Sequence, residues 1–248
     1  MKKIFSFLLA FTLFQGAFAQ ETEKKPKNPI GGRPNIPSDL KFEFGFSQLN
    51  NRPAEMGVNF FASRTFNAYY SYPIEILGKG SGMTMDIGLG IGTDKYAFND
   101  DQNLFMNEDL GPESSELLPI TDVLGDNIRI NKNVLAANYF DLPIDFTYHL
   151  NKSNYSQGFR LSVGAKIGYL YNSHTKIRYE DSTGLKRQVK DSQNYGLEKF
   201  RYGISVKAGS PGFYAWSYFG LNDLFQSGRG PFANQASQIN FGIAINVF

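Results

Sequence analysis

The sequence contains no cysteine, only two histidines and a single tryptophan. Without cysteine the chain cannot form a disulfide, and it cannot carry a lipoprotein anchor at a cleavage site. A metal site built from cysteine and histidine is excluded by the same scarcity. Beyond residues 1–19, no apolar run approaches the roughly 18 residues that a membrane-spanning helix needs. These absences leave β-structure as the route to any membrane location.

The first 19 residues are typical of an export signal. Lys2 and Lys3 form a positive start, residues 4–14 are almost continuously apolar, and an Ala-Phe-Ala pattern suits cleavage after Ala19. We expect these residues to be a signal peptide. The following residues 20–39 are rich in lysine and proline and cannot bury a core, so they predict a flexible periplasmic tail. Residues 40–248 then form the predicted barrel domain.

Little net charge remains in the mature chain. Loss of Lys2 and Lys3 reduces 25 basic residues to 23, against 23 acidic residues. A neutral chain has no electrostatic attraction for nucleic acid, so we expect no nucleic-acid partner. Aromatic residues make up 15% of the chain and glycine contributes 25 residues, a combination that favours alternating strands over helices.

Strict alternation of apolar and polar residues begins at Leu40 and recurs in eight segments. The first places Phe42, Phe44 and Phe46 on one face. The predicted strands start at residue 40 and then cover 65–76, 83–95, 134–150, 158–172, 196–209, 213–222 and 237–248. The strand at 213–222 has aromatic residues on both faces, so its orientation stays open. Pro73 and Pro143 fall inside strands, where we expect bulges.

The connections between these segments alternate in length. Long ones cover 50–64, 96–133, 173–195 and 223–236, and short ones cover 77–82, 151–157 and 210–212. Outer-membrane barrels have short periplasmic turns and longer external loops. The sequence therefore predicts an all-β fold, a transmembrane antiparallel up-and-down β-barrel of about eight strands with both termini periplasmic. Segment 96–133 is long enough to contain an extra hairpin, which would make ten strands.

The polar face of the strands is dominated by glycine, which a solvent-exposed strand has no reason to prefer. We interpret this face as a narrow interior and the apolar face as the surface that contacts outer-membrane lipids. Phe248, the final residue, is the predicted assembly signal, although it lies one residue out of the usual register.

Charged residues on the polar face are segregated along the chain, with acids in the earlier strands and bases in later ones. Because a lone charge is costly in a low-dielectric interior, we expect ion pairs that fill the barrel. An ion path or gate is the alternative. The predicted network comprises Glu43, Glu75, Asp86, Asp141, Asp145, Arg160, Lys166, Lys199, Arg201 and Lys207.

We expect no catalytic, cofactor or metal site. The run 88–92 lacks the spacing of a nucleotide-binding loop. His149 and His174 lie too far apart to cooperate, so His174 beside Ser173 is the one candidate pair for an outer-membrane hydrolase. Residues 97–127 carry eight acids and no base, and residues 174–190 carry five bases. We expect these loops to lean together over the barrel mouth; docking of a protein partner or Ca²⁺ binding is the alternative.

The run from Leu135 to Ile144, Leu-Ala-Ala-Asn-Tyr-Phe-Asp-Leu-Pro-Ile, resembles the Tyr-x-x-(Ile/Leu)-Pro-(Leu/Ile) segment of PorT-like outer-membrane β-barrel proteins of Bacteroidota. The ending Asn240 to Ala244 is similar too. The likeness covers roughly residues 40–248. It implies an outer-membrane barrel in which Pro143 is a family feature, and the namesake of that family is an accessory component of a secretion machinery.

Three functions are compatible with these observations. The favoured one is a non-enzymatic barrel that is a structural or accessory subunit of an envelope complex for secretion or assembly, with the loops 96–133 and 173–195 contacting a protein partner. A narrow pore or small-ligand uptake barrel is the alternative. A lipid-modifying enzyme is the third, with His174 as its candidate residue.

Overall fold

The computed structural model describes residues 39–78, 80–233 and 235–247. The predicted signal peptide, the tail before Asp39, and Phe248 lie outside these residues. The strands are β1 (Asp39–Asn50), β2 (Arg64–Glu75), β3 (Met83–Ala97), β4 (Gln102–Phe105), β5 (Glu116–Pro119), β6 (Arg129–His149), β7 (Arg160–Glu180), β8 (Lys186–Asp191), β9 (Phe200–Ser210), β10 (Phe213–Asp223) and β11 (Ser237–Asn246). A short helix α2 (Ile120–Leu124) and a 3-10 turn η1 (Pro231–Ala233) complete the elements.

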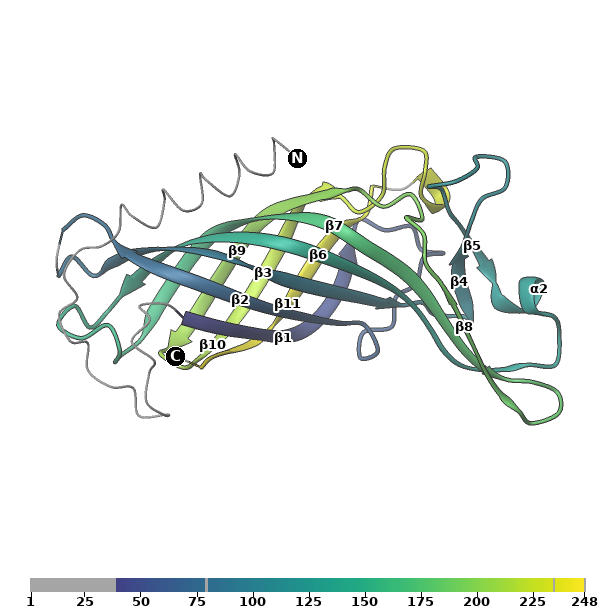
Figure 1. Cartoon of the computed structure of the whole chain (residues 1–248), viewed down its shortest axis with the longest axis horizontal. Coiled ribbons are helices and arrows are strands. Elements are labelled where there is room, and N and C mark those ends of the chain that lie inside the picture. The colour runs from purple at the N-terminus through teal and green to yellow at the C-terminus, as the bar shows by residue number, and fades with distance from the viewer. Residues whose placement is uncertain (1–38, 79, 234, 248) are drawn as a thin grey trace, which may run out of the picture. The chain divides into compact units, whose positions relative to one another are not determined.

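Eight strands close into an antiparallel barrel (Figure 1). Each of β1, β2, β3, β6, β7, β9, β10 and β11 pairs with its neighbour along the chain, and β11 returns to pair with β1. Closure leaves no barrel strand with an unpaired edge, as a lipid surround requires. The predicted all-β, eight-stranded, up-and-down barrel is confirmed.

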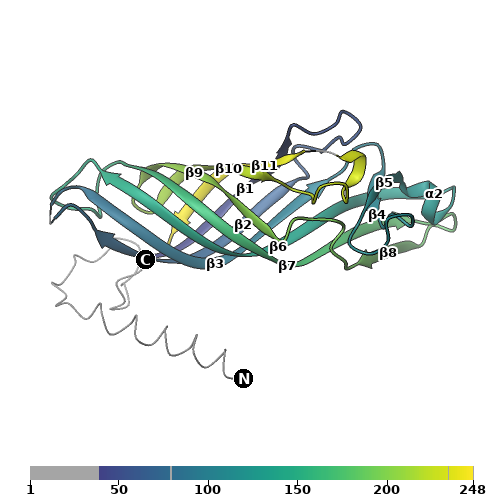
Figure 2. The same cartoon turned by 90° about the horizontal axis from the view of Figure 1, so that it is seen from above.

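The extra strands lie outside the barrel. β8 pairs with the end of β7, from Thr175 to Glu180, and forms a hairpin with it. β4 and β5 pair only with each other and form a separate two-stranded sheet within the long segment between β3 and β6. Figure 2 shows this small sheet beside α2. The segment thus contains a hairpin, but the barrel keeps eight strands.

Short and long connections lie at opposite ends of the barrel. The end that carries the short connections and Val247 is called the turn end here; its connections are 76–82, 150–159 and 211–212. In the two-residue turn, Gly212 has a φ of 94°, a conformation that favours glycine. The opposite end is the loop end, and its connections are 51–63, 98–128, 181–199 and 224–236.

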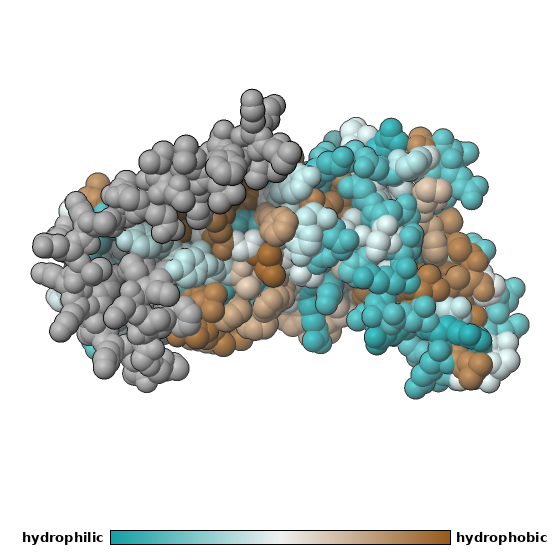
Figure 3. All heavy atoms as spheres, viewed as in Figure 1, coloured by the Kyte–Doolittle hydropathy of each residue, from teal (hydrophilic) through white to brown (hydrophobic). Residues whose placement is uncertain are grey.

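Alternation along each strand places apolar side chains on the outside. On β6, Phe140, Phe146 and Tyr148 are exposed, while Asp141 and Asp145 between them are buried. Figure 3 shows apolar side chains over the barrel strands and hydrophilic ones over the loop end. The outward apolar stretch of β6 runs from Phe140 to Tyr148, nine residues, which matches the roughly 9–11 residues of a spanning strand. We call this surface the lipid belt.

The structure settles the orientation of β10. Tyr214, Trp216 and Tyr218 are buried inside the barrel, whereas Phe213 and Phe219 are exposed on the belt. The Trp216 indole Nε1 donates a hydrogen bond of 3.1 Å to the carbonyl oxygen of Ile243. Three aromatic rings from one strand therefore fill the interior.

The bulges expected at the two prolines are absent, since the register of β3 with both its neighbours is constant past Pro73 and Pro143. Pro143 instead interrupts the pairing of β6 with β3 between Asp141 and Ile144. Gly88 lies opposite, and a side chain there would meet the proline ring at 2.9 Å. A glycine on the neighbouring strand thus accommodates the proline without a bulge.

We predict that Ile167→Arg destabilises the barrel by about 2–4 kcal/mol, because Ile167 lies near the middle of the lipid belt and is 53% exposed there. The free energy of unfolding is measured by urea titration in lipid vesicles. Leu185→Arg is the matched control, since Leu185 is 56% exposed in the β7–β8 turn away from the belt. Equal losses from both substitutions would contradict the assignment of the belt.

Candidate functional site in the barrel interior

The interior of the barrel is lined by charged residues in near balance. Among the described residues, four buried cations face five buried carboxylates, and the half-buried Arg160 at the turn end makes the numbers equal. The cations are Lys41, Lys166, Lys207 and Arg201, and the acids are Glu43, Asp86, Asp94, Asp141 and Asp145. Balance matters because a membrane-enclosed charge has little water to stabilise it.

Arg201 on β9 is the centre of the middle cluster. Its Nη2 and Nε bind the two carboxylate oxygens of Asp141 at 2.7 and 3.1 Å, and its Nη1 pairs with Asp94. The guanidinium also lies 3.8 Å from the ring centre of Tyr139. A planar guanidinium favours this bidentate binding of a carboxylate. The cluster therefore ties β3, β6 and β9 together across the interior.

Glycine makes room for this cluster. A Cβ atom at Gly92 or Gly168 would collide with the carboxylate of Asp141 and with the side chain of Arg201. Both carboxylates accept further hydrogen bonds, since Tyr69 donates to Asp141 and Asn240 donates to Asp94, each at 2.9 Å. The glycine-rich polar face thus provides space for long side chains that cross the barrel.

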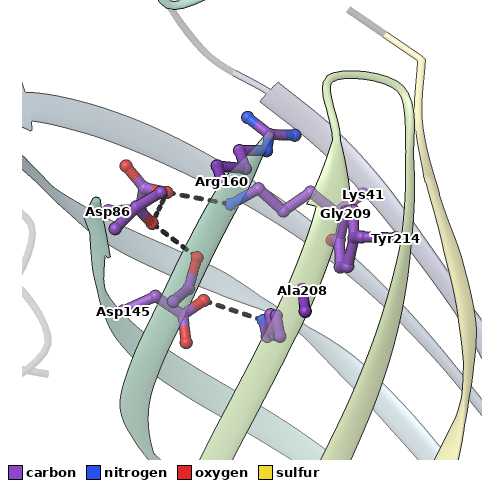
Figure 4. Close-up of a pocket in the computed structure, with 10 residues that line it drawn as sticks. Lys41, Asp86, Asp145, Arg160, Ala208, Gly209 and Tyr214 are labelled. Carbon is purple, nitrogen blue, oxygen red and sulfur yellow. Dashed lines mark hydrogen bonds and ion pairs between the residues drawn. The ribbon is translucent and has the colours of Figure 1, made fainter. Parts of the chain in front are cut away.

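A second cluster lies nearer the turn end. Lys207 on β9 pairs with Asp145 at 2.7 Å and with Glu43 at 3.0 Å. Lys41 on β1 pairs with Asp86 at 3.3 Å, as the dashed line in Figure 4 shows. The recess between these pairs holds about 10 Å³ of free space, which is roughly what one water molecule needs. The cluster therefore leaves no room for a solute.

Lys166 differs from the other buried cations because no carboxylate lies within ion-pair distance of its ammonium group among the described residues. Its Nζ donates to the Tyr69 hydroxyl at 3.4 Å and lies 4.0 Å from the ring centre of Tyr218. Ring faces attract cations. Lys166 is thus held between aromatic groups.

The predicted interior position is wrong for two residues. Glu75 is the last residue of β2 and is exposed, because β1 does not extend far enough to pair with this end of the strand. Lys199 precedes β9, is about half exposed, and pairs at 3.5 Å with Glu113 in the segment between β4 and β5. Arg160 reaches only the rim of the recess, near the Tyr214 ring.

Sequence reasoning missed Asp94, which is fully buried and pairs with Arg201. Asp94 follows Gly92 by two residues, so the alternation that placed Gly92 inside also applied to Asp94. The signal was present in the period of the strand. The structure otherwise places seven residues of the predicted network inside the barrel: Glu43, Asp86, Asp141, Asp145, Lys166, Arg201 and Lys207.

The loop end is closed by a hydrophobic core that no periodicity indicated; we call it the loop core. Its buried side chains come from all four long connections and from the adjoining strand ends. Its members include Met56, Val58, Phe98, Leu104, Leu117, Tyr195, Leu197, Leu224 and Phe225. Tyr195, whose pKa burial raises to about 12, donates from its hydroxyl to Asp191 at 2.8 Å. A packed core, rather than mobile loops, therefore covers the mouth.

Among the described residues, no ion pair joins the acidic residues 97–127 to the basic residues 174–190, although Lys199, further along the same connection, pairs with Glu113. The acidic segment 98–128 instead contacts Tyr195 and Arg229. The Ser115 hydroxyl donates to the Tyr195 carbonyl at 2.7 Å, and Arg229 donates to the Leu110 carbonyl at 3.0 Å. Among the described residues, no three histidine or acidic side chains are grouped so that they could hold a metal ion.

The candidate hydrolase pair does not assemble. Ser173 is buried and donates to the carbonyl of Gln193 at 2.6 Å, while His174 points to the opposite face of β7 and lies beside Asn172. His149 contacts the Thr84 hydroxyl at 3.1 Å near the turn end. Neither histidine is therefore placed to activate a serine nucleophile.

No helix in the described ranges has the length and apolar character of a membrane span. The closed barrel, its apolar exterior and its charged interior define the class of an outer-membrane β-barrel protein, located in the outer membrane as a multi-pass barrel. The chain belongs to the family of the outer membrane protein beta-barrel domain, whose model matches residues 18–226.

Solved structures of similar proteins share little sequence with the chain. Ail, the attachment invasion locus protein of Yersinia pestis, solved with the heparin analogue sucrose octasulfate, is 9% identical, with 84% of this chain and 97% of that chain covered and a TM-score of 0.33. A triple mutant of the Rhodopseudomonas blastica porin is 12% identical over 84% and 99% of the two chains, with a TM-score of 0.19. A search of curated proteins gives no match.

We predict that Arg201→Met costs about 3–5 kcal/mol of unfolding free energy, because Asp94 and Asp141 then stay buried without their cation. Lys166→Met should cost less than about 1.5 kcal/mol, since Lys166 has no carboxylate partner and methionine has similar volume. The unfolding free energies of both variants are measured by urea titration in vesicles, with the gel mobility of unheated protein as the readout of folding. Similar losses for the two variants would show that pairing does not decide stability here.

Proposed function

We propose that this chain is a non-enzymatic structural or accessory subunit of an outer-membrane envelope complex. In this proposal the turn end and both termini lie in the periplasm, and the loop end carries the docking surface. The observation that carries the proposal is the loop core, because a packed core holds the surface of the connections in one arrangement. Preorganisation of this kind lowers the entropy cost of binding a partner.

The acidic segment 98–128 offers the surface that suits a protein partner. Exposed acids there alternate with exposed apolar side chains, Met106, Leu110 and Val123, each more than 40% accessible. The exposed acids are Asp100, Asp101, Glu108, Asp109, Glu113, Asp122 and Asp126. Apolar groups within a field of one charge are typical of binding surfaces. A partner with a basic docking surface fits this composition.

The rest of the barrel supports a role in which no ion or solute passes through the interior. The two ion clusters fill the interior, and the loop core covers one end. An eight-stranded barrel is just wide enough for its own side chains. A narrow pore or uptake barrel, the alternative function, would require both the ion clusters and the loop core to open. The resemblance to the PorT-like family adds the expectation of a secretion or assembly complex.

Affinity purification from native membranes tests the docking surface. We expect wild-type protein to recover a defined set of envelope companions and Asp109→Asn with Leu110→Ser to lose them. Glu75→Gln with Leu77→Ser is the matched control, because it changes an exposed acid and an exposed leucine at the turn end. Recovery of the same companions by both double variants would contradict the proposal.

Conductance in planar bilayers tests the alternative. We expect no current steps from wild-type protein, because the ion clusters and the loop core block the interior. Steps of constant size that change when Asp141→Asn is introduced would support the pore and remove the proposal of a closed barrel.

A further inference from the structure

A group of cations, five of them exposed and one (Lys176) half-buried, lies on the outer wall of the barrel, just beyond the lipid belt. We call it the wall patch. Its members come from five strands, β2, β3, β6, β7 and β8, and their side chains point away from the interior. They are Arg64, Lys95, Lys132, Lys176, Arg178 and Lys190.

The strand register places these cations directly opposite one another. Arg64 faces Lys95, Lys132 faces Arg178, and Lys176 faces Lys190. Like charges at opposite positions of neighbouring strands destabilise a sheet. Three such pairs in one area are a cost that the fold does not offset with its own acids.

No carboxylate lies among the cations. The positions between them on the same strand face hold Val134 and Ala136, which are buried, and His174 and Gln188. Among the described residues, none of the six cations forms an ion pair. Glu180 is the nearest acid along β7, two residues past Arg178, and it lies opposite Arg129 and Lys186.

The position of the wall patch follows from an irregularity in β7. The pairing of β6 with β7 shifts between Asn138 and Tyr139, which gives β7 one extra residue. Tyr169 and Tyr171 face outward before the shift, and His174, Lys176 and Arg178 face outward after it. The bulge thus moves cations, rather than Thr175 and Ile177, to the outer wall.

The electrostatic environment agrees with this geometry. Lys132 lies beyond the belt, where partial burial and then the cations Lys95, Arg178 and Lys176 lower its pKa. Burial, together with Lys190, Lys95 and Lys176, also lowers the pKa of His174. Burial is the larger cause of both lowered pKa values, and repulsion by the neighbouring cations adds to it in each case.

The belt ends where the wall patch begins. The rings of Phe140 and Tyr171 lie 4.4 Å apart at the loop-end edge of the belt, where aromatic side chains meet the headgroup level of a membrane. Lys132, on the same face of β6, is eight residues from Phe140 toward the loop end. A strand residue rises about 3.3 Å, so Lys95, which faces Ala136, lies roughly 13 Å along the strands beyond Phe140, and Lys132 lies roughly 26 Å beyond it. The wall patch therefore extends outward from the headgroup layer.

We propose that the wall patch binds the phosphate groups of lipids in the leaflet that surrounds the loop end. Lipid is the chosen source because the wall patch continues the lipid belt on the outer wall and does not face the loop core. Each phosphate would lie between opposed cations and remove their mutual repulsion. This site is independent of the docking surface on residues 98–128.

Lipid titration of the full mature chain in detergent tests the proposal. The probes are diphosphorylated lipid A, the same lipid after removal of its phosphates, and soluble inositol hexakisphosphate, with retained ligand counted by native mass spectrometry. The patch variant combines Lys132→Gln, Lys176→Gln and Arg178→Gln. The control combines Lys152→Gln, Arg187→Gln and Lys199→Gln, which removes the same charge from exposed cations outside the wall patch.

We expect the patch variant to bind diphosphorylated lipid on the order of 100-fold more weakly than wild type, since each basic residue contributes about a fivefold change. The control should stay within about twofold. Equal binding by the patch variant, or undiminished binding of the dephosphorylated lipid, would overturn the proposal. Tighter binding of inositol hexakisphosphate than of the lipid would also overturn it, in favour of a soluble polyanion.

A stability measurement separates loss of the site from loss of folding. In detergent without phosphorylated lipid, the patch variant should unfold at the same or a higher urea concentration than wild type, because repulsion has been removed. Added diphosphorylated lipid should stabilise wild type and leave the patch variant unchanged. Lower stability of the variant in lipid-free detergent would show that these cations support the fold itself.

Discussion

Charges enclosed by a membrane barrel have to find their partners inside it, because neither lipid nor bulk water can stabilise them there. This constraint accounts for most of the interior. Arg201 bridges two carboxylates from different strands, and Lys207 does the same nearer the turn end. Side chains of this length cross the interior only if the facing positions are small, which explains glycine at 92 and 168.

The loop end obeys a different rule. Outside the membrane, water surrounds the connections, so they can be stabilised by burying apolar side chains as a soluble domain does. Residues from four separate connections form the loop core there. Apolar side chains therefore lie on the outside of the barrel, where lipid surrounds it, and on the inside of the loop end, where water surrounds it. At the boundary between these two regions, the bulge in β7 changes which residues face outward, from odd-numbered ones such as Tyr171 to even-numbered ones such as His174.

The sequence predicted the parts of the structure that repeat every two residues. Alternation alone located the eight barrel strands, the inward faces of all of them except β10, and most of the buried charges, and the same period would have located Asp94. It failed where the period ends. Glu75 has the right parity but lies past the pairing of β1, and Lys199 precedes the strand it was assigned to. The bulge in β7 has no sequence signature comparable with a glycine turn, so the outward direction of Lys176 and Arg178 needed the structure.

The loop core lay beyond prediction for a further physical reason. Met56, Leu104, Leu197 and Phe225 lie in four separate segments without a regular period, and only the closure of the barrel brings them together. Polar pairing between the acidic and basic loops was a natural expectation from charge, but packing of apolar side chains decides how the connections lie. The charge pattern of the sequence therefore predicted which residues lie on the surface of the loop end, but not how the connections pack against one another.

Fluorescence of the one tryptophan tests the central claim, that the apolar face meets lipid and the charged face is enclosed. Trp216 is buried inside the barrel, and Ile204 is an exposed residue of the belt on the neighbouring strand β9. In vesicles with brominated acyl chains, wild-type emission should be quenched several-fold less than that of a Trp216→Phe, Ile204→Trp variant, and aqueous iodide should quench neither. Stronger acyl-chain quenching of Trp216 than of the tryptophan at 204 would contradict the arrangement.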